Sequence, residues 1–330
     1  MNPKIPLKIL IAVLCFSMFN TFAQADSKLE KMVDLPTLIR VLDSPYAKVR
    51  RYATKKLAKM GPRAAPAVSK LLKALDDKDL FVRIGATRAL GKIGPKSVPG
   101  LRRTLKHPKP RVRRAVCDAL AEIGTKSLPA LGDLITLLGK DTSRDVRTGA
   151  AKAIGNMGAL AAKAVPTLIK SLKDKELPVR SFSVVALGKI GPKAKKAVLP
   201  LCKAFKAKGE WPLVRRYIIV AIGKIKSKPT AAIPLLVSAL KNDKTVSEAA
   251  IAIGRFGAFA SNTAGALLKA LKKQAFNKDW GPRYSIYKAL GQIGPSAKIA
   301  IPTLKKMLVR EKKSFLRNRI TKVIKQINDY

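Results

Sequence analysis

The sequence predicts an all-α fold, an α-α superhelix (a helical solenoid) built from about nine two-helix repeats. A fourteen-residue pattern, VRIGATRALGKIGP from Val82, returns as VRSFSVVALGKIGP from Val179 and as PRYSIYKALGQIGP from Pro282. Its Arg position and its closing Gly position, always eleven residues apart, align nine times, and successive copies are 30 to 37 residues apart. A fixed period in this range is typical of stacked helical repeats. Composition agrees, because 47% hydrophobic but only 5% aromatic residues suit closely packed helices.

The first helix of each repeat is expected to begin at a proline, where the missing N–H costs nothing. Apolar residues follow at helical spacing for about ten residues, and a polar turn such as Asp76–Asp79 then ends the helix. This pattern predicts first helices that begin at Pro36, Pro66, Pro99, Pro129, Pro166, Pro234 and Pro302.

The second helix of each repeat is the fourteen-residue pattern itself. Counted from its Val, small or apolar residues stand at the fourth, seventh, eighth and eleventh following positions, which form one buried stripe. Gly or Ala fills the ninth position in eight of nine repeats. Gly inside a helix costs about 1 kcal/mol relative to Ala, so we predict a close approach of the neighbouring helix there. The closing Gly predicts a left-handed cap that stops the helix.

This alternation of a Pro-started helix, an Asp-containing turn and a V-R-x-x-A-x-x-A-L-G-x-I-G helix resembles HEAT repeats, in particular the bacterial class named after the phycobilisome lyases. The resemblance covers about residues 32–327. It implies that the Arg of the pattern pairs with turn acids and carbonyls of its own or an adjacent repeat. Twelve of the 20 acidic residues lie in the turns between the two helices, so we interpret the Arg column as structural. Its members are Arg50, Arg83, Arg113, Arg147, Arg180, Arg215, Arg283 and Arg317.

The charge of the chain is extreme, with 67 Lys and Arg against 20 Asp and Glu and a formal net charge of +47. Such an excess predicts attraction to anionic partners and leaves the fold open. The second, sixth and tenth positions after the Val lie on the exposed side of the second helix. Across nine repeats these 27 positions hold 13 basic residues and two acids, Asp118 and Glu122. In a HEAT-like stack they would line the concave groove, and the candidate partner-binding residues are therefore Arg51, Lys55, Lys59, Arg88, Lys92, Arg114, Lys152, Lys189, Arg216, Lys224, Arg255, Lys288 and Lys322.

An opposing interpretation is that the charge only aids solubility. The first helices are basic too, and Lys outnumbers Arg 46 to 21. Lys is a hydrated point charge with weak geometric demands, so a diffuse basic coat fits non-specific adhesion as well as it fits a specific site.

Catalytic chemistry is not expected, and the sequence predicts no catalytic, cofactor-binding or metal-binding residues. The single histidine, His107, lies in a turn, and no His, Cys or acidic cluster has metal-ligand spacing. Cys117 and Cys202 are expected to be buried free thiols. Trp211 and Trp280 each precede a second helix, where we expect them to pack against the helix start. The repeat shared with the phycobilisome lyases does not transfer lyase activity.

The N-terminus resembles a secretory signal peptide. Lys4 and Lys8 precede an apolar run, Ile9–Phe19, and the small residues Ala23 and Ala25 follow it. We predict that residues 1–25 are a signal peptide cleaved after Ala25, that residues 26–330 are the repeat domain, and that the protein is periplasmic or secreted.

The sequence therefore favours an exported, non-catalytic, monomeric scaffold with no cofactor and no small-molecule substrate. Its expected partner is an acidic protein or an anionic polymer, namely a glycan, lipid headgroups or nucleic acid. Two alternatives remain. One is a nucleic-acid-binding protein of the HEAT-like DNA glycosylase type, which requires that the signal peptide prediction be wrong. The other is a protein–protein adaptor whose charge serves solubility only.

Overall fold

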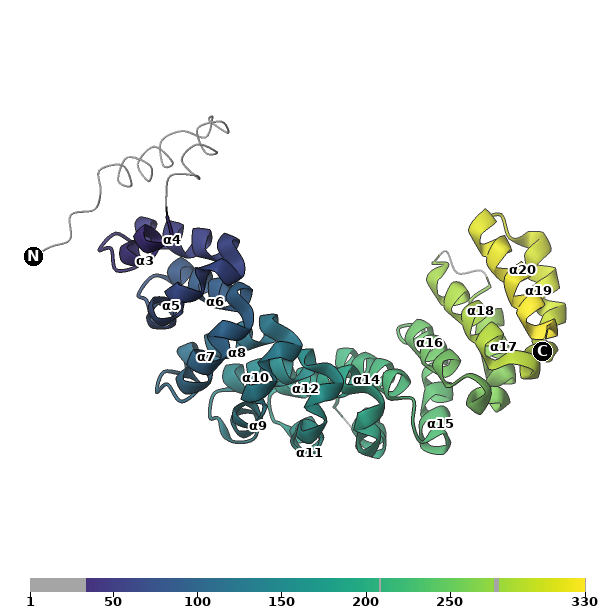
Figure 1. The fold of residues 1–330 in the computed structure, drawn as a ribbon. Helices are drawn as coiled ribbons and strands as arrows, with labels where there is room; N and C mark the ends of the chain where they lie inside the picture. The colour runs from purple at the N-terminus through teal and green to yellow at the C-terminus, as the bar shows by residue number, and fades with distance from the viewer. Residues whose placement is uncertain (1–33, 208, 276–278, 330) are drawn as a thin grey trace, which may run out of the picture. The chain divides into compact units, whose positions relative to one another are not determined.

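The protein is helical in every ordered element of the computed structural model, which describes residues 34–207, 209–275 and 279–329 (Figure 1). The chain divides into two compact units, Met1–Met157 and Gly158–Tyr330. No strand occurs in the described residues. In the same part of the chain, no helix has the length and apolar character needed to cross a membrane. The predicted signal peptide, residues 1–25, lies outside the described residues.

The first unit contains four helical pairs. Its second helices pack side by side in chain order, and short 3₁₀ helices join the pairs: η1 Gly61–Ala67, η2 Gly94–Ser97 and η3 Gly124–Ala130. The first helices are α3 Leu35–Val41, α5 Val68–Ala74, α7 Val98–Thr104 and α9 Leu131–Lys140. The second helices are α4 Ala47–Met60, α6 Leu80–Ile93, α8 Pro110–Ile123 and α10 Arg144–Asn156.

The second unit contains five pairs, which brings the described total to nine and confirms the predicted repeat number. Its 3₁₀ helices are η4 Gly158–Ala164, η5 Ser171–Lys173, η6 Gly191–Ala197, η7 Gly257–Thr263 and η8 Gly294–Ala300. The first helices are α11 Val165–Lys170, α13 Val198–Lys206, α15 Pro229–Ala239, α17 Ala264–Lys273 and α19 Ile301–Arg310. The second helices are α12 Leu177–Ile190, α14 Pro212–Ile225, α16 Val246–Phe256, α18 Gly281–Ile293 and α20 Ser314–Asn328.

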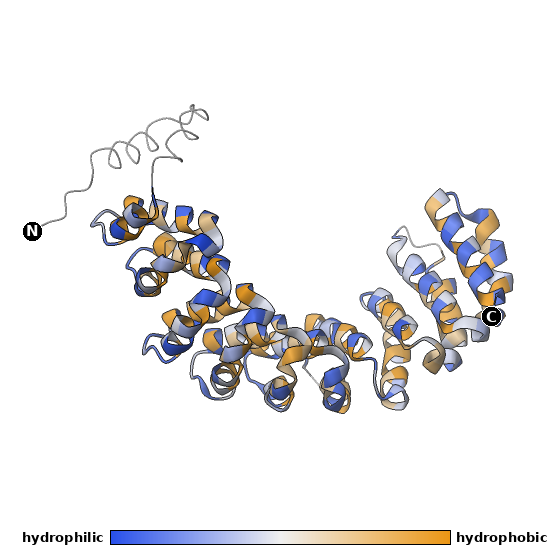
Figure 2. Cartoon of the chain, viewed as in Figure 1, coloured by the Kyte–Doolittle hydropathy of each residue, from blue (hydrophilic) through white to orange (hydrophobic). Residues whose placement is uncertain are grey.

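The buried stripe of the second helices forms the core, as predicted. In α6 the four stripe residues Ala86, Ala89, Leu90 and Ile93 are at most 1% exposed. Apolar and polar positions alternate along the helices with the helical turn (Figure 2). Burial of each Leu- or Ile-sized side chain stabilises the fold by about 2 kcal/mol.

Glycines at the ninth position allow close helix contact, which confirms that prediction. A Cβ atom on Gly188 would meet Cα of Ala221 at 3.0 Å, and one on Gly223 would meet Cα of Ala252 at 2.8 Å. In both cases the obstacle is the backbone of the next second helix in the same unit. The stack therefore needs Gly at these positions.

The closing glycines end their helices with positive φ, but not in the left-handed α conformation that the sequence suggests. Gly94 has φ 78° and ψ −137°, and Gly191 has φ 68° and ψ −138°. A side chain strongly disfavours this region, and the chain turns there into a 3₁₀ helix. Lys226 replaces Gly in the sixth repeat and takes the left-handed α conformation at φ 49° and ψ 49°. No 3₁₀ helix follows it, and α15 begins at Pro229, so the prediction that a helix begins at Pro234 is wrong.

In four repeats the repeated Arg of the second helix pairs with an acid in the turn of the next repeat, and these pairs form an Arg–acid ladder. Arg50 donates from Nε and Nη2 to the Asp77 carboxylate at 2.7 and 2.8 Å, and from Nη1 to the Ser44 and Pro45 carbonyls. The side-chain hydrogen bond to Asp77 raises the pKa of Arg50. The structure confirms the predicted structural role for Arg50 and for the three arginines named next. Equivalent ion pairs join Arg113 to Asp141, Arg180 to Glu210, and Arg283 to Glu311.

Candidate binding groove on the second helices

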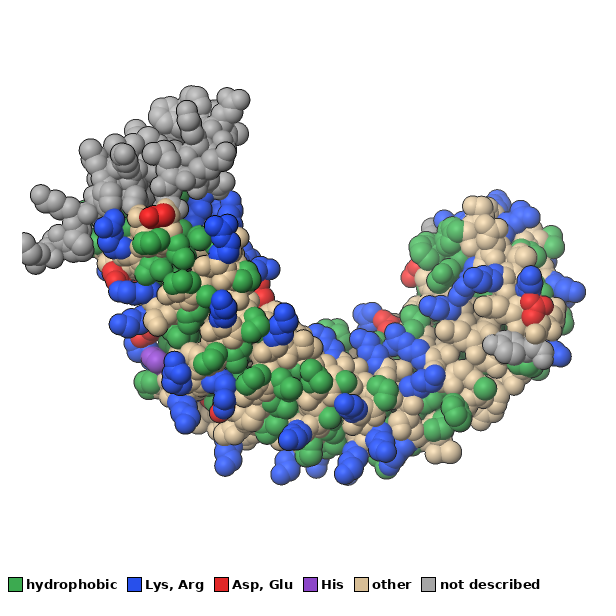
Figure 3. Space-filling model, in the orientation of Figure 1, with side chains coloured by type: hydrophobic (Ala, Val, Ile, Leu, Met, Phe, Trp, Pro, Cys, Tyr) green, Lys and Arg blue, Asp and Glu red, His purple; other side chains and the backbone are tan. Residues whose placement is uncertain are grey.

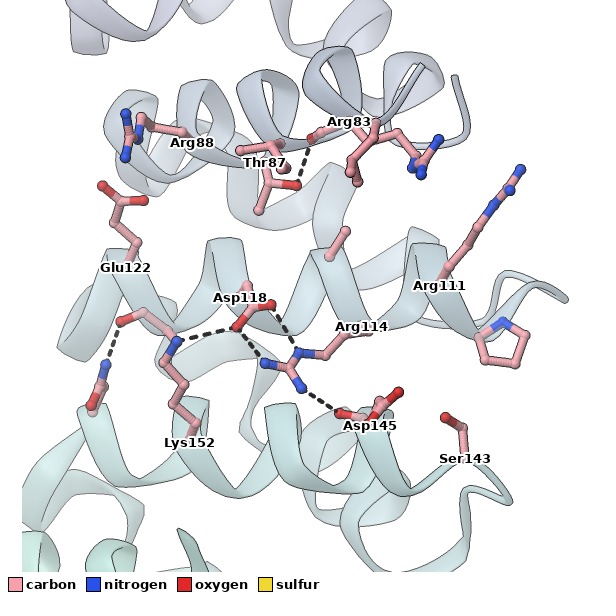
Figure 4. Close-up of a pocket in the computed structure, with 16 residues that line it drawn as sticks. Arg83, Thr87, Arg88, Arg111, Arg114, Asp118, Glu122, Ser143, Asp145 and Lys152 are labelled. Atoms are coloured by element: carbon pink, nitrogen blue, oxygen red, sulfur yellow. Dashed lines mark hydrogen bonds and ion pairs between the residues drawn. The ribbon is translucent and has the colours of Figure 1, made fainter. Parts of the chain in front are cut away.

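A groove of about 710 Å³ crosses the exposed face of α6, α8 and α10 in the first unit (Figure 4). The side chains come from the positions that the second helix cannot bury, because its other side holds the core stripe. The groove therefore lies on the face where the sequence places the basic stripe. Its lining includes Leu80, Arg83, Ile84, Thr87, Arg88, Pro110, Arg111, Arg114, Asp118, Glu122, Ser143, Asp145, Lys152 and Asn156.

An ion-pair network occupies the centre of the groove. Asp118 accepts hydrogen bonds from Arg114 at 2.8 and 3.2 Å and from Lys152 at 3.3 Å. Arg114 also donates to the Asp145 carbonyl at 3.0 Å. Burial alone would lower the pKa of Arg114, but the hydrogen bond to Asp118 leaves it raised overall. Two basic candidates are thus fixed by one carboxylate, and the centre of the groove is of mixed charge.

The two ends of the groove differ. Arg88 and Glu122 lie at one end, and Arg83 and Arg111 extend toward the turns at the other (Figure 4). Lys92 pairs with Glu122 at 3.2 Å. Arg111 pairs with Asp76 at 2.6 Å.

Asp76 lies beside the turn end of the groove and forms ion pairs with two basic side chains. Lys109 and Arg111 both donate to its carboxylate at 2.6 Å. These hydrogen bonds lower the pKa of Asp76 to about 2. The carboxylate is therefore ionised at neutral pH and offsets part of the local positive charge.

Apolar side chains are exposed beside the charged ones. Leu80 is 53% and Ile84 52% exposed at the groove. Phe81 lies next to them in the sequence, and the Arg51 guanidinium stacks on its ring at 4.6 Å. Arg51 also pairs with Asp79. The second-helix surface of this unit can therefore make apolar as well as ionic contacts.

The structure divides the 13 predicted stripe residues between the units. Of these, Arg88, Arg114 and Lys152 line the groove. At least five of the 13 pair with acids: Arg51, Lys92, Arg114, Lys152 and, with Glu248 in the second unit, Arg216. Arg88, Lys224, Lys288 and Lys322 are exposed, and Arg255 is half-buried. Figure 3 shows Lys and Arg side chains spread widely over the visible face, with few acids among them.

Several residues that line the groove were not among the candidates predicted from the sequence, including Leu80, Arg83, Ile84 and Arg111. Leu80 precedes the repeat pattern. Ile84 is apolar, although it occupies one of the exposed positions that form the basic stripe. Arg83 was assigned to the structural Arg column. The sequence did carry one indication of the groove, because Asp118 and Glu122 are the two acids of the stripe and belong to the same repeat.

The other residues singled out from the sequence are the possible metal ligands and the two tryptophans. Within the described part of the chain, no group of three or more His, Cys, Asp or Glu residues could hold a metal ion. Trp280 packs edge-on against Tyr284 and Phe315, with ring centroids 6.3 and 5.0 Å apart, as expected of packing at a helix start. Trp211 is 59% exposed instead.

The two cysteines of the described helices are free. Cys117 is buried as predicted, and burial raises its pKa to about 12. Cys202 is only half-buried, which corrects the prediction, and burial raises its pKa as well. Cys202 lies on the first helix α13, and its thiol donates a hydrogen bond to the Ala231 carbonyl oxygen, with a distance of 3.6 Å between S and O.

We expect the two thiols to differ in reactivity. Since the thiolate is the reactive species, Cys117 will resist alkylation at pH 8 in the native protein, whereas Cys202 will react slowly. Both will react at equal rates in guanidinium chloride. Mass spectrometry of alkylated peptides against time assigns the rate to each residue. Rapid native alkylation of Cys117 would contradict its burial.

Comparison with known proteins identifies the repeats. A family model described as HEAT repeats matches residues 35–98, 94–137 and 132–211. A second model, the PBS lyase HEAT-like repeat, matches residues 214–242. A search of curated proteins found no match.

Solved structures resemble the chain in fold. YibA from E. coli is 19% identical, with a TM-score of 0.54 over 94% of this chain and 98% of that one. Kap121p bound to Pho4p is 14% identical, with a TM-score of 0.65 over 97% of this chain and 40% of that one. The complex of CpcE and CpcF of phycocyanin lyase from Nostoc sp. PCC7120 is 24% identical, with a TM-score of 0.44 over 47% of this chain and 98% of that one. The chain thus spans less than half the length of Kap121p.

The HEAT repeats model covers residues 35–211 continuously, which is more than half of the 330 residues. The nine helical pairs, the inter-repeat Arg–acid ladder and the Gly-mediated helix contacts agree with it. The chain belongs to the HEAT-repeat family.

Proposed function

We propose that this protein is an exported, non-catalytic scaffold that binds an acidic segment of a partner protein through the basic surface of its second helices. The groove on α6, α8 and α10 carries the proposal, because it combines basic side chains with exposed Leu80 and Ile84. A net charge of +47 would steer an acidic partner toward that surface. Kap121p, which shares the fold, is bound to the protein Pho4p in its structure.

A protein partner fits the groove better than a uniform polyanion does. The carboxylates of Asp118 and Glu122 lie in the groove, where they would repel a continuous run of phosphates or sulfates. Exposed Leu80 and Ile84 offer contacts to apolar side chains of a peptide. Recognition of single-stranded nucleic acid would call for aromatic stacking platforms, and the lining of this groove contains no Phe, Tyr or Trp.

An anionic polymer is the second candidate, favoured by the Lys-rich surface outside the groove. In that case counterion release would supply the affinity, and binding would weaken steeply with salt. The two candidates differ in what the apolar residues of the groove contribute.

Paired charge variants test the proposal. The stripe variant changes the exposed residues Arg88, Lys224, Lys288 and Lys322 to Gln, and the control changes Arg103, Lys203, Lys269 and Lys305, which are exposed on first helices, to Gln. Both remove one Arg from the first unit and three Lys from the second. We expect the stripe variant to bind a fluorescein-labelled peptide of alternating Glu and Leu about tenfold more weakly, and the control to change the affinity less than twofold. Equal losses would show that only total charge matters and would refute the proposal.

A variant of an apolar groove residue separates the two candidates. Ile84→Gln should weaken binding of the Glu–Leu peptide and leave binding of heparin unchanged. If the true partner is an anionic polymer, the variant should bind both ligands as tightly as the unaltered protein does.

N-terminal sequencing of the protein from its native cell tests export. A mature N-terminus at Asp26 is expected, and an intact Met1 in the cytoplasm would rule export out.

A further inference from the structure

Five arginines of the Arg column hold their guanidinium groups in the same pose. In each, Nη1 donates to two consecutive carbonyls of the turn that precedes its own helix, at 2.7 to 3.1 Å. The opposite edge of the guanidinium, Nε and Nη2, takes no part in these bonds. The five are Arg50, Arg83, Arg113, Arg147 and Arg180.

In the first unit, Arg50 and Arg113 use the Nε–Nη2 edge to bind a carboxylate of the next repeat. Arg50 binds Asp77, and Arg113 binds Asp141 at 2.7 and 2.9 Å. Both acids stand five residues before the Val of the second helix. Their carboxylates also accept a turn hydrogen bond from the backbone N–H two residues on, at 2.8 and 2.9 Å.

Arg83 stands between these two, and in the next repeat the position that holds the acid for them is occupied by a histidine. His107 stands at the position of Asp77 and Asp141, five residues before Val112. Its Nδ1 accepts the same turn hydrogen bond, from the Lys109 N–H at 3.1 Å. His107 thus preserves the turn but supplies no carboxylate. Within the described chain, Arg83 forms no ion pair with an acid, and its hydrogen bonds from the side chain go to the Asp77 and Lys78 carbonyls.

The position of Arg83 makes this edge accessible to a ligand. Arg83 is half-buried and lines the groove together with Arg111, Leu80 and Pro110. The Arg83 and Arg111 side chains extend to the same end of the groove (Figure 4). Lys109 and Arg111 add positive charge beside it, which Asp76 offsets only in part.

We propose that the Nε–Nη2 edge of Arg83 is a carboxylate-binding site that receives an Asp or Glu side chain of the partner at the turn end of the groove. This inference rests on the proposed function and names the anchor of that same site. A guanidinium edge binds a carboxylate with two parallel hydrogen bonds. Asp77 and Asp141 bind the same edge of the neighbouring arginines, so the shape of the site matches a carboxylate.

His107→Asp tests the proposal, because it supplies the missing carboxylate from within the chain and keeps the acceptor for the turn. The internal Asp will occupy the Arg83 edge and exclude the partner's acid. We expect the affinity for the Glu–Leu peptide to fall about tenfold, the usual consequence of losing a charged hydrogen-bonded contact. The added inter-repeat ion pair will also raise Tm by about 2 °C.

Two control variants isolate the effect. His107→Asn keeps the turn acceptor without the charge, and Lys106→Gln removes one positive charge from the same turn. Each should change the affinity for the Glu–Leu peptide less than twofold, and neither should raise Tm. If His107→Asp weakens binding no more than Lys106→Gln does, the Arg83 site is wrong.

The stripe variant distinguishes failure of the Arg83 site from failure of the proposed function. Loss of binding in the stripe variant together with an unaffected His107→Asp variant would overturn the Arg83 site and leave the proposed function standing. Unchanged binding in both variants would overturn both. The expected result is weakened binding in each.

Discussion

Asp141→Ala is expected to lower the free energy of unfolding by about 3–5 kcal/mol. The Asp141 side chain is 3% exposed, and the Arg113 side chain that it pairs with is 13% exposed. Removing one partner of a buried ion pair leaves the other charge buried and uncompensated, which is strongly destabilising. The variant also loses the turn hydrogen bond that Asp141 accepts from the Ser143 N–H at 2.9 Å.

Urea unfolding followed by circular dichroism measures this effect. Asp145→Ala is the matched control, because the Asp145 side chain is 69% exposed and its contact with Arg144 is long, at 3.7 Å. An exposed pair of this kind contributes at most about 1 kcal/mol. A loss of stability in Asp141→Ala no larger than that in Asp145→Ala would show that the ladder does not hold the repeats together.

Gly223→Val is the substitution with the second large expected effect, and it should lower the free energy of unfolding by about 3 kcal/mol. A Cβ at Gly223 would lie 2.8 Å from both Cα and Cβ of Ala252, so α14 and α16 would have to move apart. Overpacking of a tight interface usually costs about 1–3 kcal/mol, and a branched side chain against backbone belongs at the upper end.

A glycine without such a neighbour provides the control for Gly223. Nothing lies within 4 Å of a Cβ built on Gly265 in α17. Gly265→Ala should therefore leave stability unchanged or raise it by about 0.5 kcal/mol, since Ala is the better helix former. Thermal unfolding of both variants compares them directly. Similar Tm values would mean that α14 and α16 are not in close contact.

The repeat fold could be predicted from the sequence because the same residue pattern recurs in each repeat. Nine copies of the buried stripe, the ninth-position Gly and the Arg position leave little freedom in how the helices stack. The exception is the junction at Lys226. There the missing Gly removes the 3₁₀ helix and lets α15 begin at Pro229, which a search for prolines at helix starts could not foresee.

The groove was harder to predict than the fold. Periodicity places a residue on the exposed face of its helix, but it does not say which acid it binds there. Asp118 was expected only as an exception in a basic stripe, whereas it holds Arg114 and Lys152 together. Arg83 could be recognised as an exception only in the structure, where it holds the same pose as its neighbours. His107, at the position of Asp77 and Asp141, was already visible in the sequence. The assignment of the 13 stripe residues to partner binding stays a prediction.

The Arg–acid ladder also bears on how the protein unfolds. Its ion pairs in the described helices join residues 27 to 30 positions apart, which means one repeat to the next. Stability in such an array is close to a sum of repeat and nearest-neighbour terms, as in a one-dimensional lattice. Unfolding can then begin within a unit and stop at an interface, so that part of the stack stays folded. In the first unit we expect this cooperativity to be weaker between α6 and α8. There Arg83 lacks the buried acid that Arg50 and Arg113 have, and the ion pairs of Asp76 with Lys109 and Arg111 are more exposed.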